Sequence, residues 1–400
     1  MTRRVVCALA ALSLGASALA AQETLLPSTG WGSGVAISAW HFQTAIPQAA
    51  GAVADVAQVA VPFRIRGVIG RWSVDLSGAG AYGAVHLTSS SATGESEDRL
   101  VSIAGPTDLK LRLTGPLVGD ALQVTAGFNI PTGKVQLNGD ETAALQAVGA
   151  PALHMPVGAY GTGAGMTLGV VRAFAGDDWA LAIGASAEQR TEYSPIALAL
   201  SSGKSETQVT PGTAIHVTAG LDRSLGEGRW ALLFVGDMFS KDKVRLGGSA
   251  DDGSNDYTLG PQFTLASQMA LAASGWREAS LNVAARMRSA FSDAAGQKIS
   301  GSSGTYLEGY FGGVRGGASG RGLIIGIDGR WHSGLTFTDA LVGAAATAGG
   351  LTLGYERAGT STISRFTLHG QYGTFDTGKV STSGFGATIG FSVSARREAR

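Results

Sequence analysis

The chain has 400 residues, of which 60 are glycine and only 15% are charged. Thirty basic residues balance 30 acidic ones, so the composition gives no sign of nucleic acid or an anionic membrane surface as a partner. No stretch reaches the roughly 18 uninterrupted apolar residues of a transmembrane helix. Hydrophobic residues are therefore dispersed, as alternating strands require.

The start of the chain predicts a secretory signal peptide. Two basic residues precede a short apolar stretch, and a small-residue A-x-A cleavage site ends at Ala20. We expect residues 1–20 to be removed and residues 21–400 to form a single domain. Cys7, the sole cysteine, lies inside the signal peptide, so the mature chain is expected to lack disulfide and thiol chemistry.

Apolar and polar residues alternate in segment after segment. In ALQVTAGFNI, residues 121–130, Leu122 and Phe128 point to one face while Gln123 points to the other. A soluble β-sandwich has the same alternation, because it too buries one face. Segments such as residues 257–273 exceed the roughly five or six residues usual in soluble sheets and suit a tilted membrane crossing.

Short and long connections alternate along the chain, as in outer-membrane barrels. Short turns are predicted near residues 67–71, 116–120, 175–178, 225–228, 273–275, 316–321 and 357–362, and long loops at 88–104, 133–156, 195–211, 241–256 and 292–304. The fold expected is all-β: a transmembrane antiparallel β-barrel of about 16 strands (12 to 16), with short periplasmic turns and longer extracellular loops. Residues 141–150 alone suggest a helix, and Gly349-Gly350 is either a mid-strand kink or a turn.

Four of the seven tryptophans follow a short turn and open an alternating strand. They are Trp72, Trp179, Trp230 and Trp276. Indole rings collect where hydrocarbon meets headgroups, because the ring is apolar and its N–H seeks water. We expect these four residues to lie at the membrane interface along one rim of the barrel.

Charged residues on the polar faces of the strands are predicted to line the lumen, because a charge facing lipid costs free energy. The candidates are Arg64, Arg66, Asp75, Asp108, Lys110, Arg112, Glu188, Arg190, Asp222, Arg286, Arg288, Asp328, Arg330 and Arg365. Basic residues outnumber acidic ones in this set, which indicates a mixed or weakly anion-favouring lumen. The alternative is a lumen held shut by ion pairs.

The run GPTDLKLRLTGPLVGDALQVTAGFNIPTGK, residues 105–134, carries a family resemblance. Its G-x-x-D, strand, turn, strand, P-T-G pattern resembles the outer-membrane family associated with the meta pathway of phenol degradation. That family is related in architecture to the long-chain fatty-acid transporter barrels. The resemblance implies a channel for hydrophobic or aromatic compounds. Physically, Pro131 and Gly133 also end a strand and permit a turn.

No motif in the chain specifies an enzyme, a metal site or a cofactor. The G-x-G-x-x-G match at residues 78–83 lies in an alternating segment and opens no helix. His216 and His369 are expected to face inward but belong to no catalytic or metal spacing. Acidic residues at 251, 252 and 256 form only a loose calcium-like loop.

These patterns together predict passive uptake of small hydrophobic or aromatic compounds across the outer membrane of a Gram-negative-type bacterium. Expected partners are outer-membrane lipid, small apolar or aromatic solutes and the barrel assembly machinery. A general diffusion porin is one alternative. An outer-membrane barrel hydrolase or a surface-structural protein is another.

Overall fold

The computed structural model describes residues 30–48, 51–90, 96–119, 121–200, 203–245, 253, 255–316, 320–334, 345–378 and 380–395. The predicted signal peptide, residues 1–20, lies outside them. Within the described residues, no helix has the length and apolar character needed to cross a membrane.

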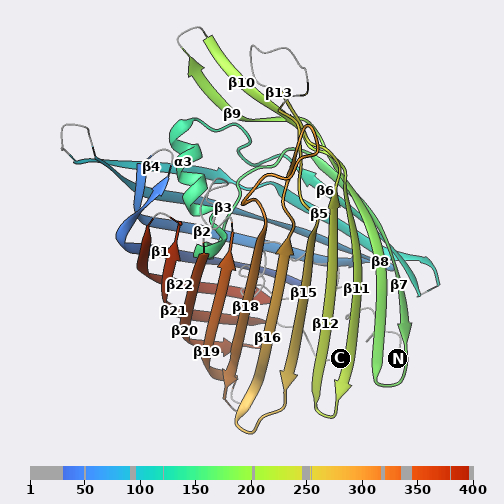
Figure 1. Cartoon of the computed structure of the whole chain (residues 1–400). Coiled ribbons are helices and arrows are strands. Elements are labelled where there is room, and N and C mark those ends of the chain that lie inside the picture. The colour runs from blue at the N-terminus through green and yellow to red at the C-terminus, as the bar shows by residue number, and fades with distance from the viewer. Residues whose placement is uncertain are drawn as a thin grey trace.

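One antiparallel sheet forms the wall of a closed barrel (Figure 1). Its strands are β1 (Gly30–Gln48), β2 (Gly51–Ile69), β3 (Trp72–Ser90), β4 (Ser96–Pro106), β5 (Leu109–Val118), β6 (Leu122–Ile130), β7 (Gly165–Ala175), β8 (Trp179–Arg190), β11 (Ala214–Leu225), β12 (Gly228–Phe239), β15 (Gln262–Leu271), β16 (Trp276–Arg288), β18 (Gly304–Arg315), β19 (Arg321–Ser333), β20 (Ala345–Ala358), β21 (Thr362–Asp376) and β22 (Ser381–Ala395). The wall closes where β1 pairs with β22.

Two of these strands share one position in the wall. Both β4 and β5 pair with β3, β4 along its second half and β5 along its first half. They are therefore two pieces of one strand, interrupted at Thr107 and Asp108, and the 17 described strands occupy 16 wall positions. The predicted all-β antiparallel barrel and its predicted strand number are confirmed.

The short turns fall where the sequence predicted them, because glycine and polar residues interrupt the alternation there. Gly70 and Gly119 adopt positive φ angles of 61° and 58° in the turns after β2 and β5, a conformation that glycine reaches without a steric penalty. Gly349-Gly350, in contrast, lies in the middle of β20, which runs unbroken through it. Of the two alternatives, the turn is wrong.

Four of the five predicted long loops contain strands or parts of strands. Residues 88–104 include the end of β3 and most of β4, and residues 195–211 include the hairpin of β9 (Tyr193–Leu200) and β10 (Gly203–Thr210). This hairpin pairs with β13 (Lys243–Arg245) in a separate small sheet above the barrel (Figure 1). A second small sheet joins β14 (Tyr257–Thr258) and β17 (Ser292–Asp293).

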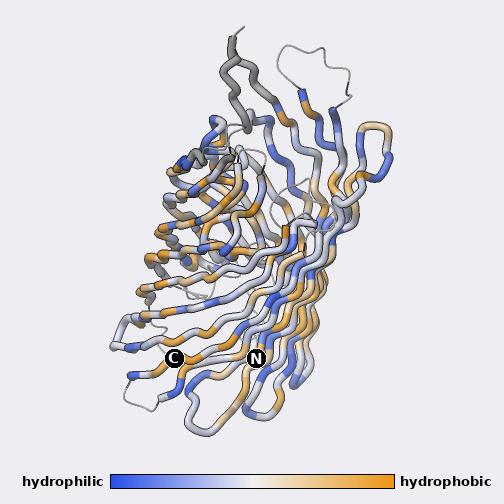
Figure 2. Tube along the Cα trace, turned by 60° about the vertical axis from the view of Figure 1, so that its left-hand side comes forward, coloured by the Kyte–Doolittle hydropathy of each residue, from blue (hydrophilic) through white to orange (hydrophobic). Residues whose placement is uncertain are grey.

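The strand register separates the two faces of the wall. On β21, Phe366, Leu368 and Tyr372 are about half exposed on the outer face, whereas Arg365 and His369 face inward, as their ion pairs with inner-face carboxylates require. Hydrophobic and hydrophilic segments alternate along the strands in Figure 2. An apolar outer face with a polar inner one suits a wall surrounded by lipid.

The connection between β6 and β7 is the feature that shapes the interior. Residues 131–164 fold inward and carry helix α3 (Gly139–Val148) and the 3-10 turn η1 (Pro151–Leu153). Helix α3 lies against β2, β3 and β4 (Figure 1). It corresponds to the helix predicted at residues 141–150. We call residues 131–164 the inserted segment.

A capping box starts α3. The Asn138 side chain accepts a hydrogen bond from the Glu141 backbone N–H at 2.9 Å, and the Asn138 N–H donates to Glu141 Oε2 at 3.1 Å. Both bonds satisfy N–H groups that a helix start otherwise leaves unpaired. Ala143, Ala147 and Val148 on the same side of the helix are buried against the wall. The helix therefore presents small residues where the barrel leaves little room.

Candidate functional site

One carboxylate anchors both ends of the inserted segment. Asp108, only 5% exposed, accepts hydrogen bonds from Gly133 N at 2.9 Å, from Thr162 N at 2.7 Å and from Asn129 Nδ2 at 2.8 Å. Gly133 follows the start of the segment and Thr162 precedes its end. The sequence predicted Asp108 as a lumen-lining charge. The structure places it at the break between β4 and β5, where backbone and side-chain groups of the segment donate hydrogen bonds to it.

The P-T-G sequence completes this anchor. Thr132 donates its hydroxyl to the Thr107 carbonyl at 2.9 Å and accepts from Leu109 N at 3.1 Å. A Cβ at Gly133 would collide with the Tyr160 carbonyl oxygen, so only glycine fits there. The motif that carries the family resemblance thus has a structural role, because it turns the chain into the barrel.

Three inward side chains of the wall hold the far end of the inserted segment. Trp40 Nε1 donates to the Leu153 carbonyl at 3.0 Å, and Arg330 Nε donates to the Ala152 carbonyl at 3.0 Å. Gln58 bonds to the backbone of the segment in both directions, and all three side chains are buried. Trp40 and Gln58 were not predicted as site residues, because a lone Trp or Gln on a strand carries no motif.

Tyr160 and Gly83 fit the segment against β3 and β4. The Tyr160 hydroxyl donates to the Ile103 carbonyl at 3.4 Å. Burial raises the pKa of Tyr160 to about 12, so the phenol keeps its proton at neutral pH. Gly83 leaves space for this ring, since a Cβ there would lie 2.9 Å from Val148 Cγ2 and 3.3 Å from the Tyr160 hydroxyl. The G-x-G-x-x-G match, residues 78–83, lies in the middle of strand β3 and opens no helix.

The inserted segment leaves a cavity of about 180 Å³ between itself and the opposite wall. The segment contributes mainly small and apolar residues, and strands β15, β16, β18 and β19 contribute polar ones. The lining comprises Val148, Gly149, Ala150, Pro151, His154, Met155, Gly158, Gln262, Arg286, Arg288, Gly304, Thr305, Tyr306, Glu308, His332, Ser333 and Gly334.

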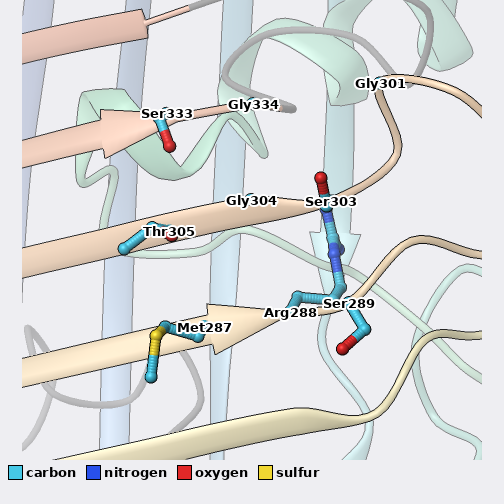
Figure 3. A pocket seen from close by; sticks show the side chains of 9 residues that line it. All are labelled: Met287, Arg288, Ser289, Gly301, Ser303, Gly304, Thr305, Ser333 and Gly334. Carbon is cyan, nitrogen blue, oxygen red and sulfur yellow. The ribbon is translucent and has the colours of Figure 1, made fainter.

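A second pocket, of about 300 Å³, adjoins the cavity at the long-loop ends of β16, β18 and β19. Figure 3 shows Arg288 and Ser289 at the end of β16 beside Ser303 and Gly304, which lead into β18. Arg288 and Gly304 line both spaces. The two pockets are therefore neighbours along the inner wall.

Hydrogen bonds organise the polar wall of the cavity. The Tyr306 hydroxyl lies 2.8 Å from His154 Nε2 and donates to Glu308, whose carboxylate is also 3.4 Å from His154. His332 packs its ring against Tyr306, with centroids 4.3 Å apart. Arg286 lies with its guanidinium 5.9 Å from the Tyr306 ring centroid. Of these residues only Arg286 was predicted.

Most of the charged residues predicted to line the lumen face inward and have a partner of opposite charge. Asp75 is 2.7 Å from Arg64 and 3.9 Å from Arg66, and the strand pairing sets Arg112 opposite the same aspartate. Further pairs or contacts join Glu188 to Arg190, Asp222 to Arg229, Asp328 to Arg330 and His369, and Arg365 to Glu356. Lys110 is exposed on the inner face of β5.

The four predicted rim tryptophans lie on the outer face at the beginning of β3, β8, β12 and β16. Trp72 and Trp179 are each 41% exposed. Their rings cover Gly115 and Gly176, where any Cβ would collide with the indole. Trp230 donates to Ser267 Oγ at 2.9 Å. Their position at a membrane interface stays a prediction.

Histidines in the lumen pair with carboxylates. His216 lies 2.7 Å from Asp237 and 3.6 Å from Glu188, and His369 lies 2.8 Å from Asp328. Among the described residues, no group of three or more His, Cys, Asp or Glu has the geometry to hold a metal ion. The acidic residues at 251 and 252 lie outside the described residues.

These features define a class of protein. A closed antiparallel barrel with an apolar outer face and a polar interior is a transmembrane β-barrel, and such barrels belong to outer membranes. No protein-family model and no curated protein sequence matches the chain.

Solved barrels with a similar course of the chain include outer-membrane proteins. The monoaromatic hydrocarbon channel CymD is 10% identical, with a TM-score of 0.39 over 95% of this chain and 94% of that one. OpdK of Pseudomonas aeruginosa, solved with vanillate, is 11% identical, with a TM-score of 0.40 over 90% and 98%. OccAB1 of Acinetobacter baumannii is 10% identical, with a TM-score of 0.43 over 90% and 96%.

Proposed function

We propose that this barrel is a passive outer-membrane channel for small hydrophobic or aromatic compounds. The observation that carries the proposal is the cavity beside the inserted segment, which has an apolar side formed by Val148, Ala150, Pro151 and Met155. A solute with apolar surface can bury that surface against the docked apolar segment, which favours its passage. A wide water-filled pore offers no such contact and therefore does not favour apolar solutes. Outer-membrane lipid and the barrel assembly machinery are the partners that this proposal requires.

The docked segment also argues against a general diffusion porin. It covers the inner face of β2, β3 and β4 and is held by buried hydrogen bonds from Trp40, Gln58 and Arg330. The cavity beside the segment measures about 180 Å³. Space of this size accommodates a single-ring solute and favours a selective channel.

The hydrolase alternative lacks a nucleophile at the histidines. Among the described residues, neither His216 nor His369 forms a hydrogen bond with a serine, threonine or cysteine, and each bonds to an aspartate. A Ser/His/Asp-type hydrolase needs a hydroxyl within hydrogen-bond reach of the base. Each histidine is instead held by an aspartate on another strand of the wall.

The aromatic part of the proposal has one further support. Residues 105–134 resemble the outer-membrane family associated with the meta pathway of phenol degradation, in the same residues that anchor the inserted segment: Asp108, Thr132 and Gly133. The resemblance, together with the apolar side of the cavity, favours aromatic solutes over sugars or peptides.

The test compares uptake by intact cells, since the outer membrane is the barrier to apolar solutes. A strain that lacks the barrel should take up toluene and benzoate more slowly than its parent, and the wild-type gene should restore both rates. Charge reversal of Lys110 and Arg112 to glutamate should slow benzoate more than toluene, because only the anion is affected by the lumen charge. Equal uptake by the deletion strain and its parent would refute the proposed function.

A further inference from the structure

The cavity beside the inserted segment has an excess of positive charge on its polar side. Arg286 and Arg288 project into it from β16, and Glu308 is the only acidic residue in its described lining. The Glu308 carboxylate is already engaged by His154, at 3.4 Å, and by the Tyr306 hydroxyl. Among the described residues, no ion pair includes Arg286.

Within the part of the chain that the structure describes, Nε of Arg286 and Nε2 of His332 are buried nitrogen atoms of this wall without a hydrogen-bond partner. The His332 side chain is almost fully enclosed, with 4% of its surface exposed. Buried polar atoms in proteins are nearly always paired. An unpaired arginine N–H and an unpaired imidazole nitrogen at one cavity therefore indicate a ligand that supplies oxygen atoms.

The side of the cavity that the inserted segment forms indicates the chemistry of the remaining part of that ligand. Ala150, Pro151 and Met155 belong to the inserted segment and offer no charged group to the cavity. Phosphate or chloride would gain nothing from this side, whereas an aromatic ring would bury apolar surface on it. The two sides together match a molecule with an anionic end and a flat apolar body.

We propose that the cavity is a binding subsite for an aromatic monocarboxylate of the size of benzoate; this inference rests on the proposed channel function and specifies its substrate class. The carboxylate accepts hydrogen bonds from the Arg286 guanidinium, and His332 Nε2, in the tautomer that carries the proton there, donates to the same group. The ring lies between Pro151 and Met155. Arg288, which also lines the adjoining pocket, meets the anion before it reaches Arg286.

The test measures binding to the purified, detergent-solubilised barrel by titration calorimetry. The probes are benzoate and its uncharged analogue benzamide. Benzoate should bind saturably, and Arg286→Gln should weaken it on the order of 10-fold or more, since a hydrogen bond to a charged group is lost. Arg286→Lys should retain part of the affinity. Arg286→Gln should weaken benzamide less than benzoate, because a neutral carbonyl oxygen makes a weaker hydrogen bond to the guanidinium than a carboxylate does.

A matched control removes an arginine outside the cavity. Arg223 lies near the short turns on β11 and pairs with Asp178 at 3.4 Å, with more than half of its side chain exposed. Arg223→Gln should leave benzoate binding unchanged. Heat-modifiable mobility of each variant on gels checks that the barrel has folded.

Benzoate binding of equal strength to the wild type and to folded Arg286→Gln would overturn the subsite, as would an equal loss in Arg223→Gln. Uptake by cells separates this failure from failure of the channel. If cells take up toluene through the barrel while Arg286→Gln leaves the affinity for benzoate unchanged, the proposed subsite is wrong and the proposed channel function is supported. If the deletion strain takes up both solutes normally while Arg286 still governs benzoate binding, the subsite stands and the uptake function is wrong.

Discussion

Gln58 and Val157 are joined by two buried hydrogen bonds. The side-chain amide of Gln58 donates to the Val157 carbonyl at 2.7 Å and accepts from the Val157 N–H at 2.8 Å. A side chain of β2 thus pairs with the inserted segment as a neighbouring strand would. The contact satisfies backbone groups of the segment that are shut off from water, and it holds the segment against the wall.

Replacing Gln58 by leucine should loosen the inserted segment. The Val157 N–H and carbonyl would be left buried without partners, at a cost of about 1–3 kcal/mol for each. We expect single-channel conductance in planar bilayers to become larger and noisier. Gln268→Leu is the control, because Gln268 lies exposed on the inner face of β15 near the short turns. Unchanged conductance in a folded Gln58→Leu barrel would show that the segment does not narrow the lumen.

Asp108→Asn should release the base of the segment. The amide would turn an N–H toward donors such as Gly133 N or Thr162 N, so the free energy of unfolding should fall by about 2–3 kcal/mol. Trypsin should also cleave after Lys134 faster than in the wild type. Asp140→Asn is the matched control: its exposed side chain lies 3.4 Å from Arg99, a contact worth less than about 1 kcal/mol. If both variants unfold and cleave alike, the anchor role of Asp108 is wrong.

Gly83→Ala should destabilise the protein by about 1–3 kcal/mol, as overpacking of a filled interior does. The added Cβ would press on Val148 and the Tyr160 hydroxyl. Gly80, on the same strand, has open space where its Cβ would lie, so Gly80→Ala serves as the control. Denaturant midpoints of the two variants in identical lipid vesicles make the comparison. The fit between β3 and the segment would be refuted by equal midpoints.

The rim tryptophans should report their depth in the membrane. Variants that retain one of Trp72, Trp179, Trp230 and Trp276, with phenylalanine at the other tryptophan positions, isolate each ring. Lipids brominated near the headgroup should quench each fluorescence more than lipids brominated at the chain ends. Trp40 alone should be quenched by neither, since it is 2% exposed and faces the segment. Equal quenching at both depths would exclude an interfacial belt.

The wall could be predicted from the sequence because its pattern is local. A strand between lipid and lumen alternates along its own length, as in the segment from Leu122 to Phe128, and each short turn interrupts that pattern. The errors arose where the alternation of apolar and polar residues is lost within a strand. The end of β3 and β4 carry polar residues on both faces, so residues 88–104 looked like a loop.

The interior could not be predicted, because its contacts join distant parts of the chain. Gln58 and Val157 are 99 residues apart, and Arg330 and Ala152 are 178 apart. No local spacing indicates such pairs. Two signals were nevertheless present: the Asn138-x-x-Glu141 capping box, which fixes the start of α3, and Gly83, a position without a side chain on the inner face of a strand.

The docking of the inserted segment has a consequence for how the barrel holds together. The first and last strands of the wall, β1 and β22, meet only when the whole chain has been laid down. Trp40 on β1 and Arg330 on β19 lie on opposite sides of that junction, and they donate hydrogen bonds to neighbouring carbonyls of η1. The segment therefore connects strands on the two sides of the junction from inside the barrel. Its two contacts exist together only while β1 and β19 are both in place, so separation of the end strands would also break one of these hydrogen bonds.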